Sequence, residues 1–131
     1  MIYMIPLLIF PLIAYNIFEL FSIVSGWRQI IFDIETMSGG IFSINITEVF
    51  TLFCIFLLFF EIIKATRSSN RTVVDHLMST LVFIICLVEF LLVSYAATSA
   101  FLILTIVSLV DVVAGYTVSI RTATRDVEFH N

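Results

Sequence analysis

Charged residues are scarce in this chain of 131 residues. They make up 12% of the sequence, whereas they make up about a quarter of an average soluble domain. Hydrophobic residues make up 61%, and the mean hydropathy is +1.17. A soluble domain of this size cannot bury so many apolar side chains, but bilayer lipid can cover them. The composition therefore predicts an all-α, polytopic membrane protein, organised as a single integral membrane domain over residues 1–131.

Basic residues are fewer still, and their positions predict an orientation. The chain has six Lys and Arg residues, scattered along its length, which argues against nucleic-acid binding. Arg28 lies on one side of the predicted spans, and the other five lie on the opposite side. By the positive-inside rule, the side with five is cytoplasmic. Both termini are then expected to be cytoplasmic. The five residues are Lys64, Arg67, Arg71, Arg121 and Arg125.

The N-terminus lacks the basic residues and the small-residue cleavage site of a signal peptide, so we expect it to remain as a span. Four segments have about the 20 residues needed to cross a bilayer core of ~30 Å. They cover residues 2–24, 44–66, 73–94 and 98–120. Between the first two, Trp27 and the apolar residues of "SGWRQIIFDIETMSGG" favour a short interfacial helix. The prediction is a bundle of four transmembrane helices. A polar tail follows it.

Motifs of known catalytic and metal sites are missing. There is no Glu-x-x-His pair for a di-metal bundle, no Gly-rich phosphate loop, no Cys-x-x-Cys pair and no nucleophile elbow. Cys54 and Cys86 lie in apolar segments and are expected to be buried free thiols. His76, at the start of the third span, is interpreted as a surface or capping residue, and His130 lies in the tail. We therefore expect no enzyme and no cofactor other than bound lipids.

Each predicted span carries a polar or small face. Residues spaced three or four apart lie on the same side of a helix, so these faces should turn inward or toward a partner. Packing of small residues and interhelical hydrogen bonds join helices in lipid. The faces comprise Asn16, Glu19, Ser22 and Gly26; Thr47, Thr51, Cys54, Leu58 and Glu61; Thr72, Asp75, Ser79, Val82, Cys86, Glu89 and Val93; and Thr105, Ser108, Asp111, Gly115 and Ser119.

The carboxylates on these faces are the strongest functional signal, because an acid at the bilayer centre costs about 2.5–3.5 kcal/mol on insertion scales. Asp111 is predicted to be the deepest. Glu19 and Glu89 lie nearer the outer ends, whereas Glu48 and Asp75 can reach headgroups. Glu61 precedes Lys64 by three residues, so snorkelling or a local ion pair explains it. The spans offer no other obvious cation for Asp111 or Glu89.

Two functions remain open on these grounds. The preferred interpretation is a small accessory or assembly subunit of a larger membrane complex, in which the polar faces associate with other subunits. The alternative is a homo-oligomeric channel or a proton- or cation-coupled transporter, with Asp111 and Glu89 as titrating sites. Either interpretation gives contact roles to Asp111, Glu89, Glu19, Glu61, Ser108, Gly115 and Asn16. The composition favours a bacterial inner membrane, with a mitochondrial inner membrane as the alternative.

Overall fold

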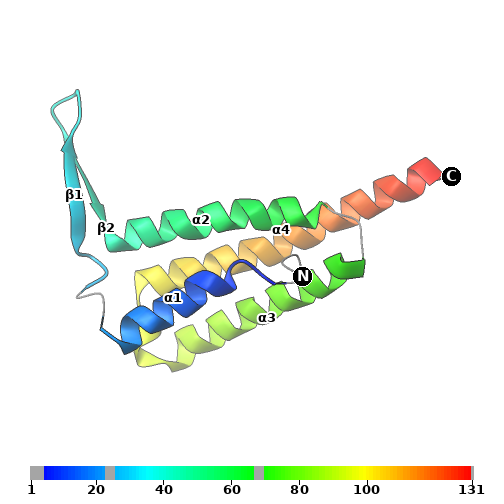
Figure 1. The fold of residues 1–131 in the computed structure, drawn as a ribbon, viewed down its shortest axis with the longest axis horizontal. Helices are drawn as coiled ribbons and strands as arrows, with labels where there is room; N and C mark the ends of the chain where they lie inside the picture. Colours follow the sequence, from blue (N-terminus) through cyan, green and yellow to red (C-terminus); the bar gives the residue numbers. More distant parts are fainter. Residues whose placement is uncertain (1–4, 23–25, 67–69, 131) are drawn as a thin grey trace.

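The computed structural model describes residues 5–22, 26–66 and 70–130, which form a helical bundle with a β-hairpin at one end (Figure 1). The described helices are α1 (Ile9–Leu20), α2 (Ile46–Ala65), α3 (Asn70–Leu92) and α4 (Ser99–His130). Strands β1 (Ile30–Glu35) and β2 (Ile41–Asn45) precede α2, and the 3-10 turn η2 (Ser94–Ala96) joins α3 to α4. Successive helices run in opposite directions. We call the two ends of the bundle the hairpin end and the Lys64 end.

Among the described residues, three helices are long and apolar enough to cross a membrane. They contain Ile46–Ala65, Val73–Leu92 and Ser99–Val118, each of 20 residues, with mean hydropathies of 2.3, 2.0 and 2.1. At 1.5 Å per residue, such a helix is about 30 Å long, which matches the hydrocarbon core. These three spans agree with the predicted segments and identify a membrane-embedded protein.

The predicted first span over residues 2–24 is helical over a shorter stretch in its described part, so a fourth spanning helix stays a prediction. Helix α1 has only 12 residues, which gives a length of about 18 Å. Pro6 lies before the helix, and Ser22, just beyond its end, has a φ of 50°. Proline cannot donate a backbone hydrogen bond, and a positive φ takes the chain out of a right-handed helix. Residues 2–4 and 23–24 lie outside the described residues.

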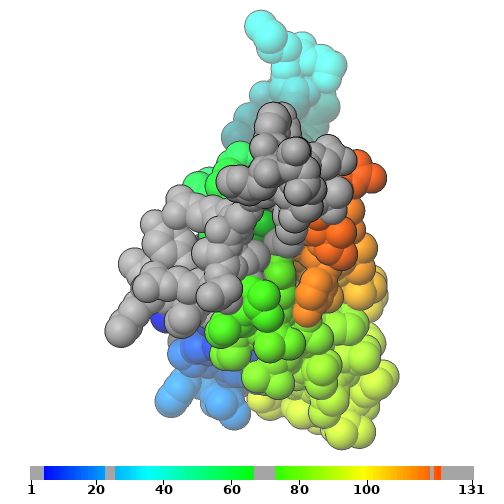
Figure 2. Space-filling model, turned by 90° about the vertical axis from the view of Figure 1, so that its right-hand side faces the viewer, coloured from blue at the N-terminus to red at the C-terminus, as the bar shows by residue number. Residues whose placement is uncertain are grey.

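The predicted interfacial helix is also wrong, because the segment forms an antiparallel β-hairpin. Its register pairs Phe32 with Ile44 and Ile34 with Phe42. Aromatic and β-branched residues favour strands, and Gly39, at φ +86°, lies in the turn between them. The hairpin projects from the helices in both views (Figures 1 and 2). It is joined to α2 without a linker, and the Asn45 side chain caps α2 by accepting a hydrogen bond from the Glu48 amide at 2.9 Å.

Helix α4 is the centre of the bundle. It packs along both α2 and α3, which hardly contact each other, and α1 packs more lightly against α2 and α4. The residues Phe101, Leu104, Val107 and Ser108 on α4 are buried. The buried positions of α3 and α4 follow the predicted polar faces, with Asp75, Ser79, Val82 and Cys86 on α3 and Thr105, Ser108, Asp111 and Gly115 on α4. The side chains of Thr72 and Ser119 lie outside the described part. Ser22, from the polar face predicted for the first span, is exposed and lies beyond the end of α1.

Candidate functional site

Lys64 lies at the centre of a buried polar cluster formed by α2, α3 and α4. Its Nζ atom donates to Glu61 Oε1 and to Asp75 Oδ1, both at 3.1 Å, and to the backbone oxygen of Ile5 at 2.9 Å. An ammonium group has three N–H donors, so every donor of Lys64 has an acceptor. Glu61 and Asp75 are only 2% and 4% exposed. The expectation that Asp75 reaches headgroups is therefore wrong, whereas the local pair of Glu61 with Lys64 is present.

The segment that precedes α1 contacts this cluster. The Leu7 amide donates to Glu61 Oε1 at 2.5 Å, and Ile5 supplies the carbonyl group that accepts from Lys64. Pro6 and Leu8 are buried. The Leu7 amide and the Ile5 carbonyl precede α1, and the charged side chains of Glu61 and Lys64 on α2 are their hydrogen-bond partners. The cluster thus holds the segment that precedes α1 against α2.

Asp111 lies inside the bundle and next to this cluster. It is 4% exposed, and its carboxyl group is hydrogen-bonded to the Ser79 side chain. The carboxyl groups of Glu61 and Asp75 act on it through space, opposed by the ammonium of Lys64. Among the described side chains, three carboxyl groups therefore lie near one ammonium group, which hydrogen-bonds two of them, Glu61 and Asp75. Lys64 acts on Asp111 electrostatically, although its three N–H donors go to Glu61, Asp75 and the Ile5 carbonyl.

His76 extends the cluster toward the end of α4. It is 7% exposed, and its ring lies 4.8 Å from the ring of Tyr116. The interpretation of His76 as a surface residue is therefore wrong. Gly115 makes room for it, since a Cβ atom added there would lie 3.3 Å from His76 Cε1. The small residue predicted as a helix-packing position thus lies against an imidazole ring.

A second polar network lies at the hairpin end and uses mainly neutral donors. Trp27 Nε1 donates to Glu19 Oε1 at 2.6 Å, and Asn16 Nδ2 donates to Glu89 Oε1 at 3.2 Å. The Tyr95 hydroxyl donates to Asn16 Oδ1 at 2.7 Å. Desolvation, together with the carboxylates of Glu89 and Glu19, raises the pKa of Tyr95, so this hydroxyl remains a donor.

Tyr15 contacts several elements at the hairpin end. Its hydroxyl donates to the backbone oxygen of Tyr95 at 2.8 Å and shares a 2.7 Å hydrogen bond with Thr98 Oγ1. Its ring stacks on Trp27, with ring centroids 4.7 Å apart, and meets Phe101 edge-on at 4.9 Å. Side chains from α1, the hairpin connection and α4 therefore form one aromatic core.

An apolar layer separates the two polar regions. Val82, Leu104 and Val107 are buried there, as are the free thiols of Cys54 and Cys86. Ser108 is also buried, but its hydroxyl donates to the Leu104 backbone oxygen of its own helix at 2.9 Å. Its other contact is Cys86 Sγ at 3.7 Å. Ser108 therefore packs within the layer and does not link the polar regions.

The seven predicted contact residues thus fall into three groups. Asp111, Glu61 and Gly115 lie at the Lys64 end, Glu89, Glu19 and Asn16 lie at the hairpin end, and Ser108 lies between them. The sequence interpretation missed the part played by Lys64, Asp75, Ser79 and His76. Asp75 and Ser79 were on the correct helix face, four residues apart. Their pairing with residues of other helices has no signal in the local sequence.

The described residues include no group of three His, Cys, Asp or Glu side chains placed to hold a metal ion. No protein-family model, curated protein or solved structure gives a significant match to the chain.

Proposed function

We propose that the chain is a small, non-catalytic integral subunit of a larger assembly in a bacterial inner membrane, and that it contacts neighbouring subunits through its β-hairpin. It needs no resident cofactor in this role, although lipids bind around it. The observation that supports the proposal most is the apolar face of the hairpin, which consists of Phe32, Ile34, Phe42 and Ile44. Phe32, Ile34 and Phe42 are 44%, 51% and 50% exposed.

A partner surface explains this face better than the chain alone does. An isolated two-stranded hairpin is marginally stable, and its outer edges keep unpaired backbone groups. The opposite face carries Asp33, Glu35 and Ser43 beside the exposed Ile41, so it is the more polar of the two faces. The hairpin also stands clear of the spanning helices (Figure 2). A neighbouring subunit with an apolar surface just outside the bilayer would cover the apolar face and extend the sheet.

The buried acids do not contribute to this contact. Asp111, Glu61 and Asp75 are buried within the same chain, and the Leu7 amide already occupies Glu61. The contacts that these acids make within the chain support a docking surface away from the polar faces. The hairpin is therefore the proposed docking surface.

Purification of the tagged protein at native expression level, in mild detergent, tests the proposal. We expect other polypeptides to co-purify in fixed stoichiometry, and Phe32→Asp with Phe42→Asp to release them. Phe42→Asp alone should weaken their binding, and Ser43→Asp is its matched control, because it adds the same single charge to the opposite face of β2. The subunit proposal fails if the particle contains only this chain, or if the control releases the partners as readily as Phe42→Asp.

A second candidate function rests on the cluster at the Lys64 end. Three carboxyl groups around one ammonium group leave an excess of negative charge in a region almost closed to solvent. A proton can neutralise that excess without displacing any residue. A proton-coupled transporter or channel needs such a group within the membrane. In that function Asp111 is the titrating residue, because Lys64 already pairs with the other two carboxyl groups.

Proton flux into liposomes that contain the purified protein distinguishes this function from the first. We expect Asp111→Asn to abolish flux driven by a pH gradient. Glu48→Gln is the control, because Glu48 is an exposed carboxylate in the first turn of α2. If the unmodified protein conducts no protons, or if Asp111→Asn conducts as well as it does, the transport function is wrong.

A further inference from the structure

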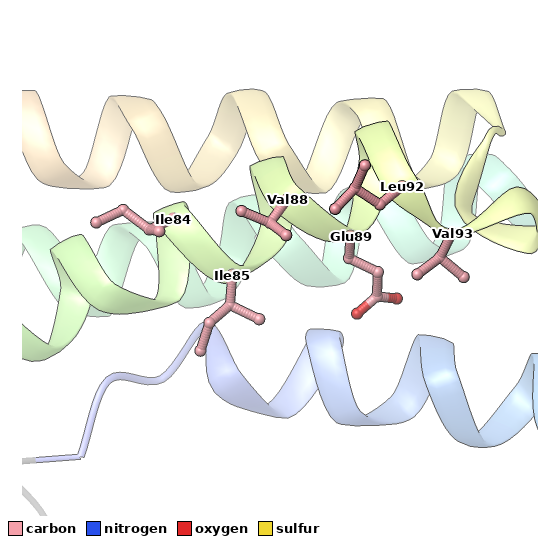
Figure 3. Close-up of a pocket in the computed structure, with 6 residues that line it drawn as sticks. All are labelled: Ile84, Ile85, Val88, Glu89, Leu92 and Val93. Carbon is pink, nitrogen blue, oxygen red and sulfur yellow. The ribbon is translucent and has the colours of Figure 1, made fainter.

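A shallow apolar groove runs along α3 at the hairpin end (Figure 3). Its volume is about 360 Å³, and it is lined by Ile84, Ile85, Val88, Glu89, Leu92 and Val93. Glu89 is the charged residue among them, and its side chain extends from α3 toward α1 (Figure 3). These residues belong to a helix of membrane-spanning length, so the groove opens onto lipid.

The Glu89 carboxyl group is only half satisfied by the described residues. Oε1 accepts from Asn16 Nδ2 at 3.2 Å, but Oε2 is buried and has no hydrogen-bond partner among them. Asn16 cannot turn to serve both oxygens, because its Nδ2 also donates to the Leu12 backbone oxygen at 2.9 Å and its Oδ1 accepts from Tyr95. A buried acceptor without a donor is costly. The orphan oxygen therefore favours a ligand that brings an N–H or O–H group.

The depth of Glu89 indicates where that donor comes from. Glu89 lies three residues before the end of α3 at Leu92, or about 5 Å along the helix axis. Because the span Val73–Leu92 matches the hydrocarbon core, Glu89 lies about one helical turn below the level at which the headgroups begin. The other groove residues are all apolar, and they reach back from Glu89 to Ile84, about 8 Å along the helix at 1.5 Å per residue. A headgroup at Glu89 thus places an acyl chain along Val88, Ile85 and Ile84.

We propose that this groove binds a phospholipid with a primary ammonium headgroup, such as phosphatidylethanolamine. The ammonium group donates to Glu89 Oε2, and one acyl chain lies along the groove. The charge of the ammonium complements the carboxylate, and charge-assisted hydrogen bonds are the stronger kind. A choline headgroup has the same charge but no N–H donor. The site therefore discriminates between headgroups by hydrogen bonding.

Lipid binding to the delipidated, purified protein tests this proposal by native mass spectrometry. Dioleoyl phosphatidylethanolamine, its N-methyl and N,N-dimethyl derivatives and dioleoyl phosphatidylcholine share the same acyl chains and lose their N–H donors one at a time. We expect affinity to fall along this series, by about tenfold from the first lipid to the last. Equal affinity for all four lipids overturns the proposal without any need for a variant.

Variants then assign the selectivity to Glu89. Glu89→Gln should reduce the tenfold preference to less than about twofold, because it removes the charge-assisted bond. Glu19→Gln should keep the preference, since that carboxylate is bonded to Trp27. Val88→Trp should weaken the binding of all four lipids to the same extent, because the larger side chain fills the groove. A preference that survives Glu89→Gln, or that disappears equally in Glu19→Gln, shows that Glu89 does not bind the headgroup.

Discussion

The two ends of the bundle bury carboxyl groups by different means. At the Lys64 end, Glu61 and Asp75 share one ammonium group, whose third hydrogen bond goes to the Ile5 carbonyl. At the hairpin end, Glu19 and Glu89 are held by the neutral donors of Trp27 and Asn16. The first arrangement depends on full charges placed away from water. The second depends on geometry and aromatic packing.

This difference has an energetic consequence. Removal of one partner from a buried ion pair leaves an uncompensated charge and costs about 3–5 kcal/mol. Interhelical hydrogen bonds in a membrane average about 0.6 kcal/mol. A single substitution at the Lys64 end should therefore lower the free energy of unfolding strongly, whereas a single substitution at the hairpin end should lower it only slightly.

The largest effect is expected from Lys64→Met. The substitution leaves Glu61 and Asp75 buried without their cation and frees the Ile5 carbonyl, so the free energy of unfolding should fall by about 3–5 kcal/mol. Unfolding in mixed detergent micelles, followed by circular dichroism, measures it. Arg28→Met is the control, because Arg28 is exposed. The triple variant Lys64→Met, Glu61→Gln and Asp75→Asn should recover most of the loss.

A loss of less than about 1 kcal/mol for Lys64→Met, comparable to a surface ion pair, would remove the distinction between the two ends. It would mean that Glu61 and Asp75 are not held as charged partners of Lys64.

Tyr15→Phe tests the hairpin end and should have an intermediate effect. It removes the hydroxyl bonded to the Tyr95 carbonyl and to Thr98 but keeps the ring that packs on Trp27. We expect a loss of about 1 kcal/mol in the same unfolding measurement. Tyr116→Phe is the matched control, since its hydroxyl makes a longer contact of 3.3 Å with Thr80 Oγ1. A loss as large as that of Lys64→Met would contradict a network built from small contributions.

The sequence predicted the three spanning helices well, because long apolar runs mark them. It did not predict that α4 continues to His130, since hydropathy shows where lipid contact ends and not where a helix ends. The last ten residues of α4 contain no Gly or Pro to stop it. The hairpin was missed although its signals were present. Ile30, Phe32 and Ile34 alternate with other residues, and the pair Gly39–Gly40 marks a turn.

For the candidate site, the sequence predicted which residues share a face of one helix, but not which residues of different helices are in contact. Spacing correctly placed Asp111 and Ser108 on one buried face of α4, and Asp75 with Ser79 on one face of α3. Local spacing also paired Glu61 with Lys64. It could not show that Lys64 reaches Asp75, because that contact depends on how α2 and α3 pack against α4. The isolated charge expected at Asp111 thus belongs to a cluster that only the tertiary structure assembles.

The smallest effect is expected from Asp111→Asn, the substitution at the deepest carboxylate. Asparagine has the same shape and can keep the hydrogen bond to Ser79. It also removes one of the three carboxyl groups around Lys64. The hydrogen bond to Ser79 becomes weaker because its acceptor is no longer charged, whereas the repulsion from Glu61 and Asp75 is removed. These two effects oppose each other, so the free energy of unfolding should change by less than about 1 kcal/mol. Asp75→Asn is the matched comparison, because it also breaks the 3.1 Å pair with Lys64.

We expect Asp75→Asn to destabilise the protein more than Asp111→Asn in parallel unfolding experiments. The reverse order would mean that the bundle requires a charge at Asp111, which would make this residue part of the ion-pair framework. In the expected order, Asp111 is the one carboxyl group of the cluster that can change its protonation at little cost to the fold. That property separates its proposed role in proton binding from the structural roles of Glu61 and Asp75.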